Sequence, residues 1–194
     1  MADILISDSP LIKNPGALNP RHLKTISELN EWESANILEA QQAYFHTPKK
    51  RVFTSGLIQK LHKSMFDRTW AWAGIYRNHD FFDGGVSFHN ISKSIYELCI
   101  DLAHWQNKHM NIIEQSVRLH HTLASIRAFE GGNMRHARMI ADLLLYTAGH
   151  KRPVWPDNDA LKNTDFMKRY TDSMKLADRG DYEAMLELTW NLMK

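Results

Sequence analysis

The stretch LHHTLASIRAFEGGNMRHARMIADLLL, residues 119–145, decides the fold of this chain. On both sides of its Glu-Gly-Gly-Asn turn, apolar residues recur every three or four positions, which predicts two helices joined by a tight connection. The inward stripe of the second helix consists of Met139, Ile140, Leu143 and Leu144. We expect Asn133 to cap this helix, because an Asn side-chain oxygen can accept a hydrogen bond from an unpaired N–H of the first turn.

Two arginines, Arg135 and Arg138, follow in the first turns of that helix. A cation is disfavoured there by ~0.3–1 kcal/mol, because the amino end of a helix is the positive end of its dipole. A glycine turn, free N–H groups and two arginines on one face together predict an anion-binding site. On spacing alone, both arginines could equally point into water or pair with carboxylates elsewhere in the fold.

The same helical spacing extends over most of the chain and predicts an all-α domain. The predicted helices span 27–46, 54–68, 91–108, 112–129, 134–149, 158–177 and 181–193. One stretch breaks the pattern: at about 79–89, Asp83-Gly84-Gly85 divides two short β-prone pieces, which predicts a small β-hairpin. Residues 1–20, with three prolines, are expected to form an extended arm, and residues 21–194 a single domain.

Composition narrows the class of protein. A chain of 194 residues with 43% hydrophobic residues can bury one core, and Cys99 and the Trp70–Trp72 segment fall at positions expected to join it. The formal net charge of +2 argues against a general nucleic-acid or membrane-surface role, although residues 118–152 hold six basic and two acidic side chains. No apolar run approaches the ~18 residues that cross a bilayer. The N-terminus does not resemble a secretory signal, so we expect a cytoplasmic protein.

Residues 127–138 resemble the signature of the Fic/Doc family, His-x-Phe-x-Asp/Glu-Gly-Asn-Gly-Arg-x-x-Arg. The positions in register are Arg127, Phe129, Glu130, Gly131, Gly132, Asn133, Met134, Arg135 and Arg138. Further blocks resemble the branch of Fic proteins called mobile mystery protein B; they span 28–41, 61–77, 132–145 and 169–186. The resemblance implies a Fic-type helical domain of about seven helices with a hairpin flap.

The resemblance also implies a chemistry. Fic proteins typically transfer AMP from ATP, with Mg²⁺, to a Ser, Thr or Tyr hydroxyl of a target protein. By this likeness, phosphates would be held by Gly131, Gly132, Asn133, Arg135 and Arg138, and Phe129 would anchor the motif. The target segment would dock on the flap, at Phe82 and Val86, as an added strand. Ser27 to Glu31 resembles the start of the family's inhibitory motif, which makes Glu31 a candidate inhibitory residue.

Three positions depart from the family pattern. Arg127 replaces the family's general-base His, and a guanidinium has no lone pair to accept a proton. Gly131 stands where the acidic Mg²⁺ ligand is expected, so the chain has no predicted metal ligand. Met134 replaces a glycine that lets phosphate approach the backbone.

These departures leave more than one function open. The first is a protein adenylyltransferase of the Fic class that is catalytically impaired, since loss of a general base costs 10²- to 10⁴-fold in rate. The alternative is a regulatory pseudoenzyme or toxin–antitoxin-like partner that binds nucleotide or protein without transfer. Nucleic-acid binding through 118–152 is disfavoured, because no helix-turn-helix or basic stripe is apparent. His120, His121 and His136 are expected to be structural, and no His spacing predicts a metal site.

Overall fold

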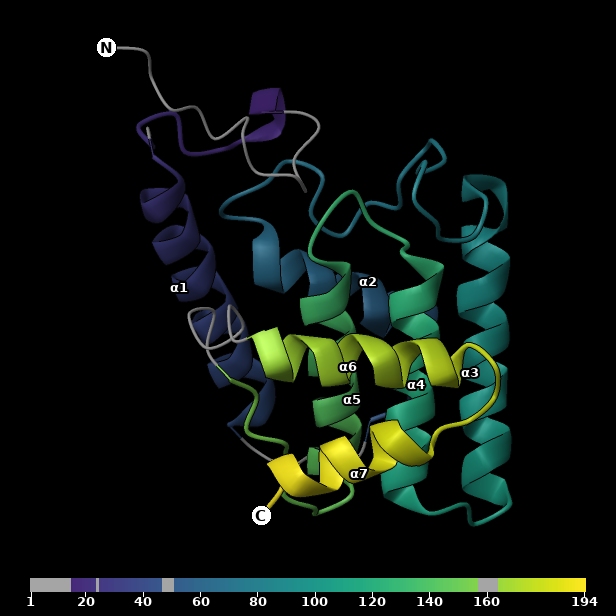
Figure 1. Cartoon of the computed structure of the whole chain (residues 1–194). Helices are drawn as coiled ribbons and strands as arrows, with labels where there is room; N and C mark the ends of the chain where they lie inside the picture. The colour runs from purple at the N-terminus through teal and green to yellow at the C-terminus, as the bar shows by residue number, and fades with distance from the viewer. Residues whose placement is uncertain (1–14, 24, 47–50, 157–163) are drawn as a thin grey trace.

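The computed structural model describes residues 15–23, 25–46, 51–156 and 164–194. Within these ranges lie seven α-helices and two short 3-10 turns (Figure 1). The helices are α1 (Ile26–Phe45), α2 (Ser55–Phe66), α3 (Ile91–Asn107), α4 (Ile112–Ile126), α5 (Asn133–Thr147), α6 (Thr164–Ala177) and α7 (Glu183–Leu192), and the turns are Pro15–Ala17 and Phe88–Asn90. The all-α prediction is confirmed. Helix α4 ends three residues before its predicted end at 129, because Arg127 adopts a left-handed backbone with φ +50°.

Polar caps begin three of the helices. Thr25 and Glu28 form a reciprocal capping box at the start of α1. Thr54 accepts a bond from the Leu57 N–H at α2, and Asn111 caps α4. These side chains satisfy N–H groups that have no partner inside a helix, so the chain enters each helix at a defined residue.

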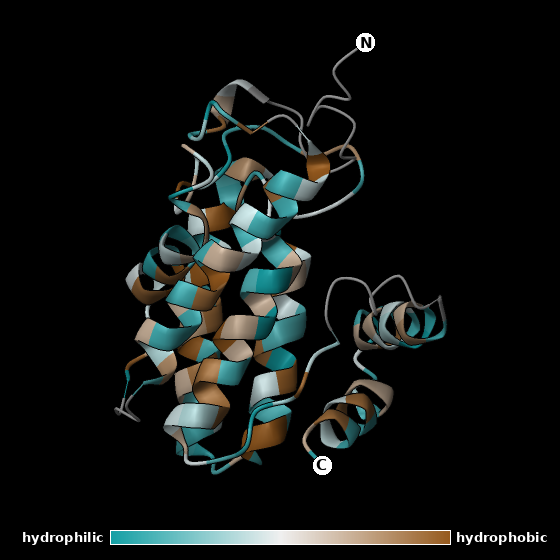
Figure 2. Ribbon diagram, turned by 90° about the vertical axis from the view of Figure 1, so that its left-hand side faces the viewer, coloured by the Kyte–Doolittle hydropathy of each residue, from teal (hydrophilic) through white to brown (hydrophobic). Residues whose placement is uncertain are grey.

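The core lies among α2, α3, α4 and α5, with α1 along one side. Antiparallel α4 and α5 pack together at the centre, and α6 and α7 lie across one side of this pair (Figures 1 and 2). Fully buried apolar side chains from these helices include Ile58, Leu61, Met65, Phe66, Ile95, Leu98, Leu119 and Ile140. Trp70 belongs to this core, whereas Trp72 and Cys99 are half-buried at its edge. No helix in the described ranges has the length and apolarity to span a bilayer.

The predicted hairpin at 79–89 does not form, and the described ranges contain no β-strand. The backbone pairs instead at two isolated antiparallel bridges, Leu18 with Trp70 and Tyr76 with Phe129. Through the first bridge the described part of the predicted arm is attached to the domain; residues 1–14 lie outside the described ranges. Hydrogen bonds from the buried side chain of Arg77 to the His79 and Val86 carbonyls take the place of the backbone hydrogen bonds of a hairpin.

Candidate functional site

The signature turn connects α4 to α5 at the upper end of the bundle in Figure 1. Arg127 ends α4 in the left-handed conformation, and Gly132 precedes α5 with φ +70°. The two left-handed residues reverse the chain direction, so the turn lies across the amino end of α5.

The Asn133 side chain closes this turn and does not cap α5. Its Oδ1 accepts from the Phe129 N–H at 2.9 Å, and its Nδ2 donates to the Phe129 carbonyl at 2.7 Å. The capping prediction was therefore wrong, because both amide atoms are already used by Phe129. Gly132 is the N-cap residue and no side chain caps it, so N–H groups of the first turn of α5 are available to a ligand.

His62 of α2 holds the signature turn in place through hydrogen bonds. The sequence motif does not include this residue. Its Nδ1 accepts from the Gly74 N–H at 2.9 Å, which leaves Nε2 to donate to the Gly131 carbonyl at 3.0 Å. The ring stacks on Phe129 with centroids 3.6 Å apart. Burial holds the pKa of His62 well below its ordinary value, and the neighbouring His136 adds to this effect. The sequence does contain a signal for His62: it follows Leu61 on the buried face of α2, and a buried polar ring needs hydrogen-bond partners.

Gly132 has no room for a side chain. A Cβ there would lie 2.5 Å from Cε2 and Cζ of Phe66, and its φ of +70° disfavours any L-residue. We expect Gly132→Ala to lower the free energy of unfolding by about 2–5 kcal/mol, the sum of the left-handed penalty and overpacking. Urea denaturation measures this loss. Gly149→Ala is the matched control, because Gly149 also has positive φ but nothing within 4 Å of its Cβ position; equal losses in both variants would show that Phe66 does not constrain the turn.

Arg135 is paired with a carboxylate from α1. Its Nη1 lies 2.6 Å from Oε2 of Glu33, a buried residue whose other oxygen accepts from the Trp70 indole N–H at 2.5 Å. Glu31, the residue singled out by the inhibitory-motif resemblance, is exposed on α1. The α1 carboxylate that pairs with the signature arginine Arg135 is therefore Glu33, two residues further along.

Arg138 differs from Arg135 in having no carboxylate partner among the described residues. Its guanidinium lies over the Trp155 ring, 5.3 Å from the centroid. Burial lowers the pKa of Arg138, and the charge of Arg135 lowers it further, whereas Tyr170 and Asp142 act in the opposite direction. Because an arginine stays protonated in proteins, Arg138 is a largely desolvated cation whose N–H groups can receive an anion.

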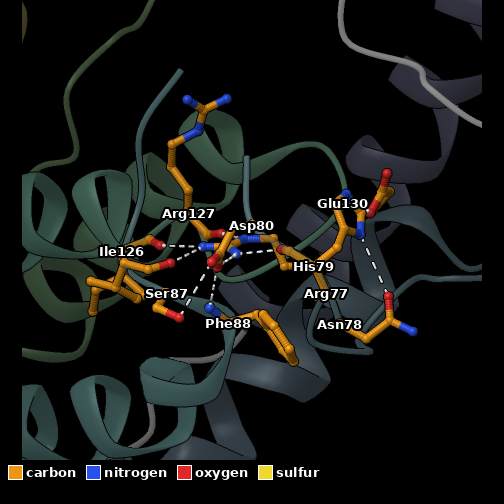
Figure 3. A network of polar contacts seen from close by, with 10 residues as sticks. Arg77, Asn78, His79, Asp80, Ser87, Phe88, Ile126, Arg127 and Glu130 are labelled. Carbon is orange, nitrogen blue, oxygen red and sulfur yellow. Dashed lines mark hydrogen bonds and ion pairs between the residues drawn. The ribbon is translucent and has the colours of Figure 1, made fainter. Parts of the chain in front are cut away.

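Arg127 points to a different partner, so the three arginines do not share one set of contacts. Its Nη1 lies 3.1 Å from Oδ1 of Asp83 and also donates to the Asp83 carbonyl, and its guanidinium lies 4.8 Å from the Phe81 ring centroid. Figure 3 shows this side chain extending away from the polar network beneath it. Arg127 therefore tethers the 79–89 segment to the end of α4.

The buried side chain of Arg77 explains why the 79–89 segment is a loop. Its buried guanidinium donates to the backbone carbonyls of Arg127, His79 and Val86 (Figure 3). Asp80 accepts from the Phe88 N–H at 2.7 Å. Side chains thus fill the space between the two arms, where a hairpin would have its backbone ladder.

The residues predicted to dock a target lie on this loop. Phe82 is fully exposed, and the half-buried Val86 donates its N–H to the Ile126 carbonyl at 3.3 Å. The loop therefore presents one unburied aromatic side chain beside the signature turn.

The residues present do not fit a Mg²⁺ ion. Oε2 of Glu130 lies 3.6 Å from Nε2 of His79, on the loop side of the turn (Figure 3). Gly131 offers no carboxylate, and a Cβ there would lie 3.0 Å from the Trp72 ring. No group of three or more metal-binding side chains occurs in the part of the chain that the structure describes.

Three further histidines near the signature are buried and hydrogen-bonded. His120 contacts the Tyr170 hydroxyl, His121 contacts Asp178, and His136 contacts the Ile58 carbonyl, at 2.8 to 2.9 Å. Burial lowers the pKa of His120 to about 3 and that of His136 to about 4. These contacts agree with the structural role predicted for all three.

Comparison with known proteins shows which fold this chain shares. Among solved structures, the fold is similar to the N-terminal FIC domain of the Bep8 effector from Bartonella sp. 1-1C, with a TM-score of 0.70 and 22% identity over 91% of this chain and 89% of that one. It is similar to BepC from Bartonella tribocorum with bound AMPPNP, with a TM-score of 0.66 and 21% identity over 88% of this chain and 88% of that one. It also resembles an N-terminal Fic domain from Bartonella quintana with bound ADP, with a TM-score of 0.68 and 20% identity over 97% of this chain and 92% of that one.

At these identities the structural likeness shows the fold. No curated protein matches the sequence. The model of the Fic/DOC family, in contrast, matches residues 52–145, a range that contains α2 to α5 and the whole signature turn. Residues 52–145 are therefore similar to the Fic/DOC family, and the chain has the fold of the solved Fic domains.

Proposed function

We propose that the domain binds an adenine nucleotide through the amino end of α5, Arg135 and Arg138, and that it is an AMP-transferring protein of the Fic class with impaired catalysis. The observation that carries the proposal is Arg138: its largely desolvated guanidinium forms no ion pair with a carboxylate in the described ranges, and it lies on the helix whose amino end is uncapped. A nucleotide phosphate would supply hydrogen-bond acceptors and negative charge to this guanidinium. Two structures with this fold contain bound AMPPNP and ADP, which supports the choice of ligand.

Impairment follows from Arg127. A guanidinium cannot take a proton from an attacking hydroxyl, and this one is held by Asp83 and Phe81. The geometry offers no Mg²⁺ ligand at Gly131, so we propose nucleotide binding that does not depend on the metal. A target protein would dock at Phe82 on the loop, in a cytoplasmic setting.

A second candidate is a regulatory pseudoenzyme that holds nucleotide or a toxin–antitoxin-like partner without transfer. The tether between Arg127 and Asp83 favours it, because the residue at the catalytic position stabilises the loop. The assignment to the mobile mystery protein B branch is part of the proposal and rests on the sequence blocks.

A calorimetric titration with ATP tests the binding proposal. We expect the chain to bind ATP without Mg²⁺, and Arg138→Ala to weaken binding by about ten- to hundred-fold, the usual range for a charged hydrogen-bond partner. Arg135→Ala should cost less, because Glu33 already neutralises that side chain. Arg179→Ala, at the exposed turn after α6, is the matched control. A chain that does not bind ATP, or an Arg138→Ala variant that binds as tightly as the parent, would refute the proposal.

A further inference from the structure

A polar cluster surrounds Arg138 outside the signature turn; three of its members are buried, and Arg138 and Trp155 are partly buried. It consists of His120 from α4, Arg138 and Asp142 from α5, Trp155 from the segment after α5, and Tyr170 from α6. The Trp155 indole N–H donates to both carboxylate oxygens of Asp142, at 3.2 and 3.1 Å. The same indole ring lies under the Arg138 guanidinium.

These contacts fix the direction of the Arg138 side chain. Asp142 follows Arg138 by four residues, so the two side chains lie on the same face of α5, one turn apart. Asp142 holds the indole through its N–H, and the indole face in turn lies against the guanidinium. His120 packs edge-on to the same indole, with centroids 5.5 Å apart. Trp155 therefore limits the rotamers of Arg138 and contacts the face of its guanidinium, which leaves the N–H groups at the edge without a carboxylate partner among the described residues.

We propose that Trp155 is the positioning residue for Arg138, and that the charge of Asp142 sets the affinity of the site for a nucleotide phosphate. This inference rests on the proposed function and adds a form of regulation to it. A charged Asp142 offsets the positive charge of Arg138 and weakens anion binding. A neutral Asp142 leaves that charge uncompensated and strengthens anion binding.

The groups that face Asp142 determine when its charge changes. Burial raises the pKa of Asp142 to about 7, while the Trp155 N–H, Arg152 and Arg138 act in the opposite direction. From α4 the facing group is His120, whose pKa of about 3 keeps it neutral at physiological pH. From α6, Tyr170 has a pKa of about 12 and faces Arg138.

The remaining neighbours leave Asp142 as the titrating group of the cluster. Thr189 of α7 lines the same region with a hydroxyl that donates to the Met185 carbonyl. His121 is adjacent to His120 but contacts Asp178. Within the cluster, Asp142 is therefore the group that changes charge between pH 6 and 8.

ATP affinity without Mg²⁺, measured by calorimetry from pH 6 to 8, tests the inference. Against the parent we compare Asp142→Asn, which keeps an oxygen acceptor for the indole but carries no charge. We expect parent affinity to fall about five-fold more over this range than that of Asp142→Asn. ATP titrates equally in both experiments, so the difference isolates Asp142.

Two substitutions at Trp155 test the positioning role. Trp155→Ala should weaken ATP binding about five-fold across the pH range, because Arg138 loses its aromatic contact. Trp155→Phe keeps a ring for Arg138, so its loss should be smaller. It removes the N–H that favours the charged carboxylate, so the midpoint of the pH dependence should move to higher pH. Trp190→Ala removes a half-exposed indole from α7 and is the control.

The outcomes separate this inference from the proposed function. If the parent binds ATP and Arg138→Ala weakens binding as expected, but Asp142→Asn shows the parental pH dependence, the inference is wrong and the proposed function stands. If the parent does not bind ATP at any pH, both fail. If Trp155→Ala does not fold, Trp155→Phe and Asp142→Asn still test the inference, since both variants retain most of the buried volume.

Discussion

Replacing Arg127 by His, together with Gly131→Asp and Met134→Gly, is expected to raise the rate of AMP transfer from ATP by about 10²- to 10⁴-fold, the usual contribution of a general base. A neutral imidazole offers the lone pair that the guanidinium lacks. The backbone at 127 also tolerates the change, because His is enriched among the non-glycine residues that adopt the left-handed conformation, here φ +50°. Incorporation of labelled AMP into protein, with pyrophosphate release as a second readout, measures the gain.

The matched control is Arg127→Asn in the same background. Asn also tolerates left-handed backbone, and, like His, it is too short to retain the contacts that Arg127 makes with Asp83 and Phe81. Both variants therefore release the loop, but only the His variant supplies a base. Equal transfer rates in the two would show that loop release, and not proton transfer, limits the reaction.

The two accompanying substitutions are not structurally equal. Met134 is 38% exposed in the first turn of α5, so its replacement by Gly costs about 1 kcal/mol of helix propensity and no core contact. A Cβ at Gly131 would lie 3.0 Å from the Trp72 ring, so an Asp there requires the half-buried indole to shift. Thermal unfolding of each single variant shows whether the scaffold accepts the change before its activity is compared.

The helices could be predicted from the sequence because their signal is local. Apolar spacing and turn residues placed all seven, and most ends agree within one or two residues. The hairpin prediction used equally local signals, namely a glycine turn between β-prone pieces. It failed because Arg77, which precedes the segment, inserts its side chain between the two arms and binds their carbonyls.

The site was less predictable, because its decisive partners are distant in sequence. The signature identified Arg135 and Arg138, yet Glu33 lies 102 residues from Arg135, and His62 lies 69 residues from Gly131. No spacing rule joins such pairs, since the packing of α1 and α2 against α5 brings them together. Asn133 shows the same limit at short range: a helix cap and a turn-closing contact use the same amide, and the path of residues 129–132 decides between them.

Below pH 6.5 the chain is expected to lose stability steeply, by about 4 kcal/mol between pH 6.5 and 4.5. His62, His120 and His136 are at most 2% exposed, and the pKa of each is lowered in the folded state. An unfolded chain takes up protons at these residues below their ordinary pKa of 6.5, and the folded chain does not. The unfolded state therefore binds three more protons, and stability falls as the pH falls.

Asp142 acts in the opposite direction over part of this range. Its pKa is raised to about 7 from 3.8, so between these values the folded state holds one proton that the unfolded state has released. The unfolded state thus binds three protons at the histidines that the folded state does not bind, and the folded state binds one at Asp142. The net difference of two protons changes the free energy of unfolding by at most about 3 kcal/mol per pH unit. Stability should therefore be greatest close to pH 7.

Urea denaturation of matched variants separates these contributions. Asp142→Asn removes the compensating proton, so its loss between pH 6.5 and 4.5 should grow to about 7 kcal/mol. His136→Gln keeps a donor for the Ile58 carbonyl without a titrating ring, so its loss should shrink by about 2 kcal/mol. His104→Gln changes an exposed histidine on α3 and should leave the pH dependence unchanged. Should the parent be equally stable at both pH values, the three rings cannot be buried and neutral, and the support of the signature turn by His62 would have to be abandoned.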